Sequence, residues 1–313
     1  MDLEIKNNDN QLVSIIVVTY NSSAFVLETL ESAKNQTYKN IELIISDDCS
    51  SDDTVLKCKE WIAKNGNRFV HTNVLTVDKN TGISMNLNRG LQASQGEWLK
   101  FIAGDDVLLE TCIATNITIA SENNASFYFS KMRIVPENEN MVNYFQNGFD
   151  LFSEGKKQYP LLLKANYLPA PTSFMNKKTL LELGGLNVKF PMLDDYPLWI
   201  KATKKGYRLY ISDIETVIYR VHSQSISNQQ KILKQKEFYS NVRYLKSWYS
   251  FQITLIKDQF LHGFVFLACN NLIEILQFKT MLLCNNKRNV FSVSLYNIFT
   301  ILKPSLYIKK KQQ

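Results

Sequence analysis

The sequence predicts an α/β fold, with a mostly parallel sheet flanked by helices and a basic helical appendage at the C-terminal end. Two observations carry the prediction. Continuous β-branched and aliphatic segments occur at 13–19 and 41–46, as in strands that are buried on both faces of a parallel sheet. Each of these segments is followed by apolar residues at helical spacing, and strands that alternate with helices in this way form βαβ units.

The predicted elements follow one another closely through the first half of the chain. Ser22 or Ser23 is expected to cap the helix after the first strand, and Asp52 to Thr54 the helix after the second. A third helix carries Ile83, Leu87 and Leu91 on one face. We expect strands at 13–19, 41–46, 73–77, 98–103, 126–135, 207–211 and 216–221.

Polar loops follow the strands of the predicted sheet at the ends where open α/β sheets bind ligands. The strand 98–103 stops at Gly104-Asp105-Asp106, which places two carboxylates side by side. Adjacent ionised carboxylates repel each other and need a cation or solvent. The dipeptide alone leaves open a solvated acidic turn or a divalent cation that carries a phosphate-bearing substrate. The acidic and amide-rich loops at the same edge favour the cation.

The second half of the chain gives fewer cues. Residues 143–165 are aromatic and irregular, and no element is predicted there. A short helix at 180–186 is ended by glycine. Another helix begins within 193–200. Asp194-Asp195 stand at its start, and Pro197 lies in its first turn, where proline is tolerated.

The net charge of +7 is unevenly distributed. Residues 229–313 carry +10, whereas residues 1–228 carry −3. We therefore predict two regions, the α/β domain at 1–228 and a helical, basic and aromatic region at 229–313. The uncharged stretch 290–302 beside lysines suits peripheral contact with an anionic membrane, with packing on the α/β domain as the alternative. No nucleic-acid-binding motif accompanies the charge, so a nucleic-acid partner is not expected.

The remaining bulk features favour a cytoplasmic protein, peripheral on the inner face of the cell membrane if the basic region binds lipid. Five scattered cysteines show no zinc or disulfide spacing. The N-terminal segment 1–11 is polar and acidic, unlike a signal peptide. No uncharged apolar run approaches the roughly 18–20 residues that span a bilayer.

Several short motifs, taken in order, resemble those of the inverting family-2 glycosyltransferases with the GT-A fold, a Rossmann-like arrangement. The resemblance covers residues 12 to about 228. It implies transfer of a sugar from a UDP-sugar donor to a hydroxyl of a glycan acceptor, with a lipid-linked oligosaccharide in bacterial surface polysaccharide biosynthesis as the setting. The motifs are Val17-Val18-Thr19-Tyr20-Asn21, Asp47-Asp48, Asn80-Thr81-Gly82, Asn88-Arg89-Gly90-Leu91, Gly96-Glu97-Trp98, Gly104-Asp105-Asp106, Asp194-Asp195-Tyr196 and Tyr219-Arg220-Val221-His222.

The resemblance implies a nucleotide-sugar site. Thr19, Tyr20 and Asn21 would line the base and ribose. Asp48 would accept a hydrogen bond from the base imide, which favours uracil. Arg89 would face the phosphates, with a structural arginine on the helix surface as the alternative.

The resemblance also implies a metal and a catalytic base. Asp105 and Asp106 would hold Mn²⁺ or Mg²⁺ against the diphosphate. His222 would reach the diphosphate or the metal, with a structural histidine as the alternative. The family motif often has a further aspartate where this chain has Ala103, so a weaker and readily exchanged cation is expected. Asp195 would be the base that deprotonates the acceptor hydroxyl, although one member of the Asp194-Asp195 pair could instead serve as the helix cap.

Two other functions remain open at the sequence level. A non-catalytic nucleotide-sugar binding module is suggested by Ala103 alone. A nucleotidyltransferase would share a nucleotide-binding α/β sheet and a metal, but it normally has a glycine-rich loop after the first strand. This chain has Thr19-Tyr20-Asn21-Ser22-Ser23 there.

Overall fold

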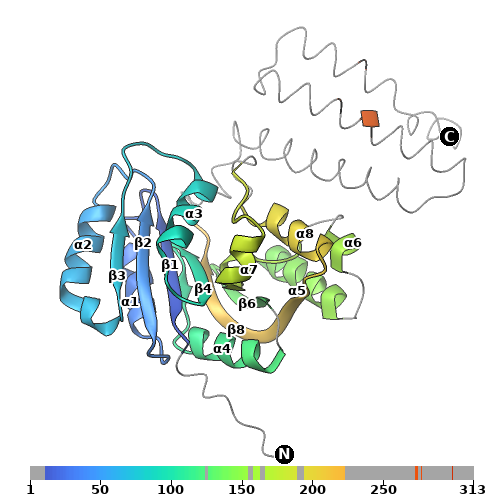
Figure 1. Cartoon of the computed structure of the whole chain (residues 1–313), viewed down its shortest axis with the longest axis horizontal. Helices are drawn as coiled ribbons and strands as arrows, with labels where there is room; N and C mark the ends of the chain where they lie inside the picture. The colour runs from blue at the N-terminus through green and yellow to red at the C-terminus, as the bar shows by residue number, and fades with distance from the viewer. Residues whose placement is uncertain are drawn as a thin grey trace, which may run out of the picture. The chain divides into compact units, whose positions relative to one another are not determined.

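The computed structural model describes residues 11–222, apart from 124–125, 154–157, 163–165 and 189–193, together with positions 272, 273, 276 and 298. The chain divides into two compact units, Met1–His222 and Ser223–Gln313, and the first holds the mixed sheet in Figure 1. The predicted basic region 229–313 lies almost wholly outside the described residues. Its helices and its contact with membrane therefore stay predictions.

The first half of the unit is a parallel sheet with strand order β3-β2-β1-β4. Strands β1 and β2 are buried along nearly their whole length because β-branched and aliphatic side chains point to both faces. Helix α3 packs so closely on β1 that a Cβ on Gly90 would clash with the Ile16 side chain. The strands and helices predicted for this half are confirmed: β1 Val13–Thr19, α1 Val26–Lys34, β2 Ile41–Asp47, α2 Thr54–Asn65, β3 Thr72–Leu75, α3 Ile83–Ala93 and β4 Trp98–Ala103.

The sheet continues beyond β4 in the order β7-β6-β8-β5 and becomes mixed. Strand β7 pairs antiparallel with both β4 and β6, whereas β6 and β8 run parallel. The remaining elements are η2 Gly66–Arg68, β5 Val107–Leu108, α4 Cys112–Asn123, β6 Phe127–Val135, α5 Glu139–Ser153, α6 Gln158–Leu162, η3 Ala170–Thr172, β7 Phe174–Asn176, α7 Lys177–Glu182, α8 Tyr196–Lys204 and β8 Leu209–Arg220.

Three local predictions need correction. Helices α5 and α6 occupy the stretch for which no element was predicted. Strand β8 is a single strand where two were predicted. Its middle is polar and exposed, which interrupts the apolar pattern, and ion pairs such as Lys131–Asp213, at 2.9 Å, connect this part to β6. Helix α1 starts without a side-chain cap, and the backbone carbonyl of Ser22 accepts the first N–H groups instead.

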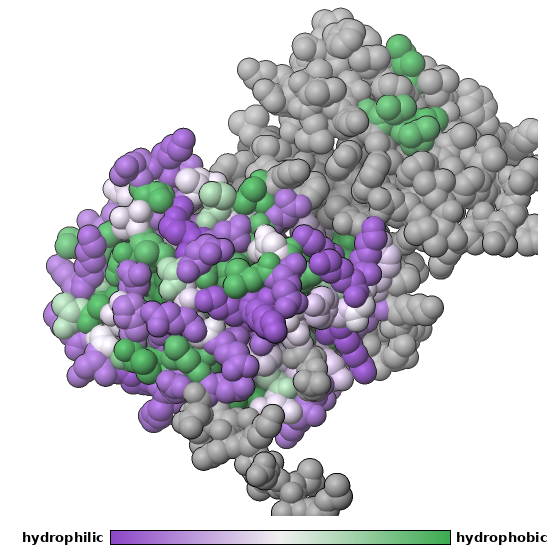
Figure 2. Space-filling model, in the orientation of Figure 1, coloured by the Kyte–Doolittle hydropathy of each residue, from purple (hydrophilic) through white to green (hydrophobic). Residues whose placement is uncertain are grey.

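Apolar side chains between the sheet and its helices form a continuous core. The outer face seen in Figure 2 is mostly hydrophilic, with separate apolar patches. Within the described parts of the chain, no helix combines the length and apolar character that a membrane crossing requires.

Candidate active site

The loops after β1 and β2 hold each other by side-chain hydrogen bonds. The Thr19 hydroxyl, which is buried, donates to Asp47 at 2.7 Å. The Ser50 backbone N–H also donates to Asp47, at 2.8 Å. Asn21, with φ of 51°, accepts from the Ser51 backbone N–H at 2.8 Å. Of the three residues predicted to line the base and ribose, Thr19 is buried, whereas Asn21 and the ring of Tyr20, at 53%, are exposed.

Asp48 is 3% exposed and sits at the C-terminal end of β2. It accepts hydrogen bonds from the Thr81 backbone N–H at 2.9 Å, the Thr81 hydroxyl at 2.5 Å and the Gly82 backbone N–H at 2.7 Å. Arg89 adds an ion pair at 3.2 Å. The loop before α3 thus wraps this carboxylate, a partnership that the motif 80–82 did not reveal from sequence.

The guanidinium of Arg89 is directed into the same loops. Its Nη1 donates to the Asn86 side chain at 2.9 Å and to the Asp47 carbonyl at 3.2 Å, and its Nη2 donates to the Thr81 hydroxyl at 2.8 Å. This arrangement is the one expected of a structural arginine. A contact of Arg89 with phosphate stays a prediction.

The structure brings Asp105 and His222 together although they are far apart in sequence. Asp105 Oδ2 and His222 Nε2 lie 3.0 Å apart. The Phe25 ring packs on the imidazole with 4.5 Å between ring centroids. The β4 end approaches the β1 loop so closely that a Cβ on Gly104 would lie 2.8 Å from Thr19, which requires glycine there.

Asp106 is 1% exposed and accepts a hydrogen bond from the Arg220 backbone N–H at 2.9 Å. Burial and the neighbouring Asp105 carboxylate raise the pKa of Asp106 well above its usual range. The Arg220 side chain pairs with Glu28 at 2.9 Å and lies over the Phe25 ring. The Asp106 carboxylate is thus held against the end of β8, next to the Asp105–His222 pair.

The donor atoms fit a divalent cation that also binds substrate phosphates. No group of three or more His, Cys, Asp and Glu side chains that could hold a metal occurs among the described residues. Asp105 and His222 offer one oxygen and one nitrogen donor. Mn²⁺ and Mg²⁺ are commonly held by one or two protein ligands, with substrate phosphates and water completing the shell.

Asp195 caps helix α8. Its Oδ1 accepts from the Tyr196 backbone N–H at 2.6 Å, and its Oδ2 accepts from the Asn166 side chain at 2.8 Å. Burial raises the pKa of Asp195, and these hydrogen bonds oppose the shift. Burial together with the Asp195 carboxylate raises the pKa of Asp194 to about 7. Asn166 was missed because it lies in the stretch without motifs.

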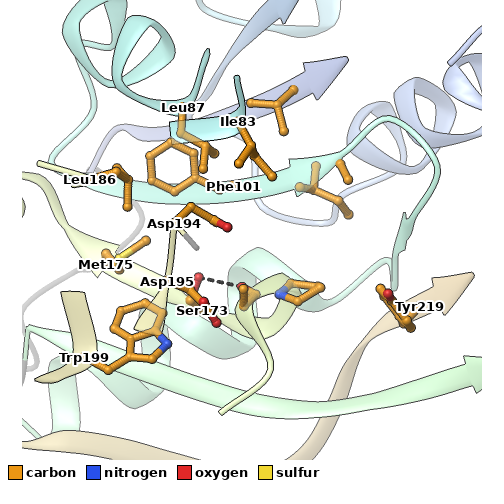
Figure 3. A pocket seen from close by; sticks show the side chains of 15 residues that line it. Ile83, Leu87, Phe101, Ser173, Met175, Leu186, Asp194, Asp195, Trp199 and Tyr219 are labelled. Carbon is orange, nitrogen blue, oxygen red and sulfur yellow. Dashed lines mark hydrogen bonds between the residues drawn. The ribbon is translucent and has the colours of Figure 1, made fainter. Parts of the chain in front are cut away.

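A pocket of about 210 Å³ lies between the two halves of the sheet, and Figure 3 shows its side chains. One wall comes from β1, α3 and β4, and the other from η3, β7 and α8. Ala103, two residues before Asp105, and Tyr219, three before His222, both line it. Asp194 and Asp195 also line this pocket, whereas Asp105 and His222 are not among its lining residues.

Comparison with known proteins identifies the family. Residues 14–183 match the family model described as glycosyl transferase family 2. The chain belongs to glycosyltransferase family 2. Family membership favours a glycosyltransferase over the binding module and the nucleotidyltransferase.

Two curated relatives each align with about 70% of this family-2 glycosyltransferase. It is 30% identical over 222 residues, 69% of this chain and 80% of the relative, to the UDP-Glc:alpha-D-GlcNAc-diphosphoundecaprenol beta-1,3-glucosyltransferase WfaP of Escherichia coli. It is 27% identical over 247 residues, 72% of this chain and 77% of the relative, to the GalNAc(5)-diNAcBac-PP-undecaprenol beta-1,3-glucosyltransferase of Campylobacter jejuni.

Solved structures share the fold of this glycosyltransferase. The Staphylococcus aureus TarS 1–349 complex with UDP-GlcNAc superposes with a TM-score of 0.61 at 18% identity, over 94% of this chain and 82% of that one. The Pyrobaculum calidifontis mannosyltransferase PcManGT, in complex with GDP-Man and Mn²⁺, gives a TM-score of 0.58 at 14% identity, over 96% of this chain and 84% of that one. The predicted GT-A fold is confirmed.

Proposed function

We propose that this glycosyltransferase moves a sugar, with inversion, from a UDP-sugar to a hydroxyl of a lipid-linked glycan acceptor in bacterial surface polysaccharide biosynthesis. The observation that carries the proposal is the pocket lined by Asp195, whose lining also includes Ala103 and Tyr219, two and three residues before the paired Asp105 and His222. The names of the E. coli and C. jejuni relatives support the donor and acceptor classes.

Tyr20 and Asp48 would form the nucleotide end of the site. The exposed Tyr20 ring is available to stack on the base. A carboxylate has about four acceptor positions, and Asp48 already has four donors. Binding of a uracil N3–H therefore requires one of these donors to move, and the loop 80–82 is the part that would adjust.

Asp195 would act as the general base. It takes the proton of the acceptor hydroxyl while the hydroxyl oxygen forms a bond to the anomeric carbon. The bond from that carbon to the phosphate oxygen breaks on the opposite face, and UDP departs. A single displacement of this kind converts an α-linked donor into a β-linked product.

Asp105 and His222 would hold the divalent cation, Mn²⁺ or Mg²⁺, and Asp106 would join them only if its carboxylate turned away from the Arg220 backbone N–H. When bound, the cation neutralises the charge that develops on the departing diphosphate. With Ala103 in place of a further carboxylate, we expect a cation that exchanges readily and binds best with the donor present. The Mn²⁺ in the PcManGT complex supports a divalent ion for the fold.

We also propose that the protein works in the cytoplasm, on the inner face of the cell membrane. The +10 charge of residues 229–313 would attract anionic lipid near a lipid-linked acceptor. Co-sedimentation with anionic vesicles tests this. The full chain should bind more strongly than a chain ending at 228, and equal binding would contradict the proposal.

A screen of UDP-sugars for release of UDP tests the function directly. We expect release that needs both Mn²⁺ or Mg²⁺ and an acceptor, with the Asp195→Asn variant as the matched control. Formation of pyrophosphate from a nucleoside triphosphate and a sugar phosphate would instead identify a nucleotidyltransferase. Absence of UDP release with every donor would contradict the proposal.

A further inference from the structure

The described wall of the active-site pocket is mostly apolar. Side chains from both halves of the sheet contribute to it, and in Figure 3 Phe101, Leu87 and Leu186 lie on one side of Asp194. Helix α3 supplies the neighbouring Ile83, and α8 supplies Trp199 across the pocket. Such a lining offers dispersion contacts but few hydrogen bonds.

Two polar side chains of this lining, Ser173 and Asp195, are already engaged within the protein. The Ser173 hydroxyl donates to the Ala170 carbonyl at 2.7 Å. Both oxygens of Asp195 accept hydrogen bonds from Tyr196 and Asn166. Among the described residues, no other residue donates a hydrogen bond to the Asp194 carboxylate, which reaches the pocket in Figure 3.

A sugar ring that carries only hydroxyl groups matches this lining poorly. Each sugar hydroxyl that leaves water without gaining a hydrogen-bond partner weakens binding by about 1–3 kcal/mol in typical protein sites. An acetamido group matches it better, because it combines one N–H donor with a methyl group. The carboxylate of Asp194 can accept from the N–H while the methyl group packs on the apolar wall.

We propose that this pocket binds the acetamido group of an N-acetylhexosamine, with Asp194 as the hydrogen-bond acceptor and Leu87, Phe101 and Leu186 around the methyl group. The inference rests on the proposed transferase function. It adds a specificity-determining role for Asp194, which is distinct from the base. The acetamido group can belong to the donor sugar or to the acceptor sugar, since both approach Asp195.

The experiment compares two matched pairs of substrates with the full-length protein. UDP-GlcNAc and UDP-Glc form the donor pair. Lipid diphosphates that carry GlcNAc or Glc form the acceptor pair. We expect the acetamido member of at least one pair to have a kcat/KM about 10- to 100-fold higher, and the pair that discriminates identifies the source.

Two variants tie the preference to the pocket. Asp194→Ala and Leu186→Ala should each reduce the preference to within about threefold, whereas Met85→Ala, at an exposed site on the same helix as Leu87, should leave it unchanged. Binding of UDP alone, which has no sugar, should persist in all three variants and shows that they fold.

The outcomes separate the inference from the function on which it rests. Transfer with equal kcat/KM within both pairs would overturn the acetamido inference and leave the transferase intact. A preference that survives in both Asp194→Ala and Leu186→Ala would also overturn it. Lack of transfer from every UDP-sugar, with UDP still bound, would instead overturn the proposed function.

Discussion

Two carboxylate sites on opposite halves of the sheet are built differently. Asp48, at the end of β2, has four donors, among them the Arg89 guanidinium. Asp194 and Asp195, before α8, are adjacent acidic residues in a mostly apolar pocket. Tyr196 and Asn166 donate hydrogen bonds to Asp195. The first site is fixed by the protein itself. The second keeps carboxyl groups with raised pKa values, which suits proton transfer and sugar binding.

Removing the base should have the largest effect. In Asp195→Asn the amide cannot take a proton, so kcat should fall about 10²- to 10⁴-fold. Binding of UDP, measured by calorimetry, should stay within about threefold of wild type, because the residues proposed to contact the nucleotide lie on the other half of the sheet. A variant with undiminished kcat would show that Asp195 is not the base.

Breaking the first site should reduce stability and UDP affinity together. Arg89→Met leaves Asp48 without its cation, at a cost of about 2–3 kcal/mol in the free energy of unfolding, because the Asp48 side chain is only 4% exposed. Urea unfolding measures the change. The matched control is Arg133→Met, whose ion pair with Glu215 is largely exposed and should contribute under about 1 kcal/mol. Equal losses in the two variants would contradict a fixed site at Asp48.

The second site should make stability depend on pH in a defined direction. The pKa of Asp194 rises from 3.8 to about 7 on folding, so the native state binds the proton more tightly than the unfolded chain does. The free energy of unfolding should therefore decrease as pH rises from about 4 to 7, by at most about 1.4 kcal/mol per pH unit from this group. Asp194→Asn should flatten this part of the curve. An unchanged slope in the variant would show that another group is responsible.

The smallest effect should come from the residue that orients the base. Asn166 donates to Asp195, and this bond favours the ionised carboxylate. In Asn166→Ala the acid limb of the pH profile of kcat/KM should move up by about 0.5–1 unit. At high pH the rate should approach that of wild type. A uniform loss of rate with no shift would indicate only a structural role for Asn166.

The two halves also differed in how far the sequence predicted them. Strands β1, β2 and β4 are buried on both faces, so their continuous apolar segments fixed both element type and boundaries. The loops that follow carry charged motifs, and Asp48, Asp105 and Asp195 could be selected from them. The long-range partners could not, because Asn166 and the loop at Thr81 meet these carboxylates only through the tertiary fold.

The second half of the sheet was harder to predict for related reasons. Helix α5 begins in a polar run that resembles a turn, and β8 has an exposed polar middle that interrupts its apolar pattern. From the sequence, Ala103 was expected to weaken a metal site and was the one hint of a non-catalytic binding module. In the fold its side chain lines the pocket.

The division of labour between the two neighbouring aspartates is tested most directly by comparing Asp195→Asn with Asp194→Ala at saturating UDP-sugar and acceptor. We predict that Asp195→Asn loses about 10²- to 10⁴-fold in kcat. We predict that Asp194→Ala keeps kcat within about tenfold and loses the preference for the acetamido sugar. The reverse order of kcat values, with Asp194→Ala the inactive variant, would contradict this division.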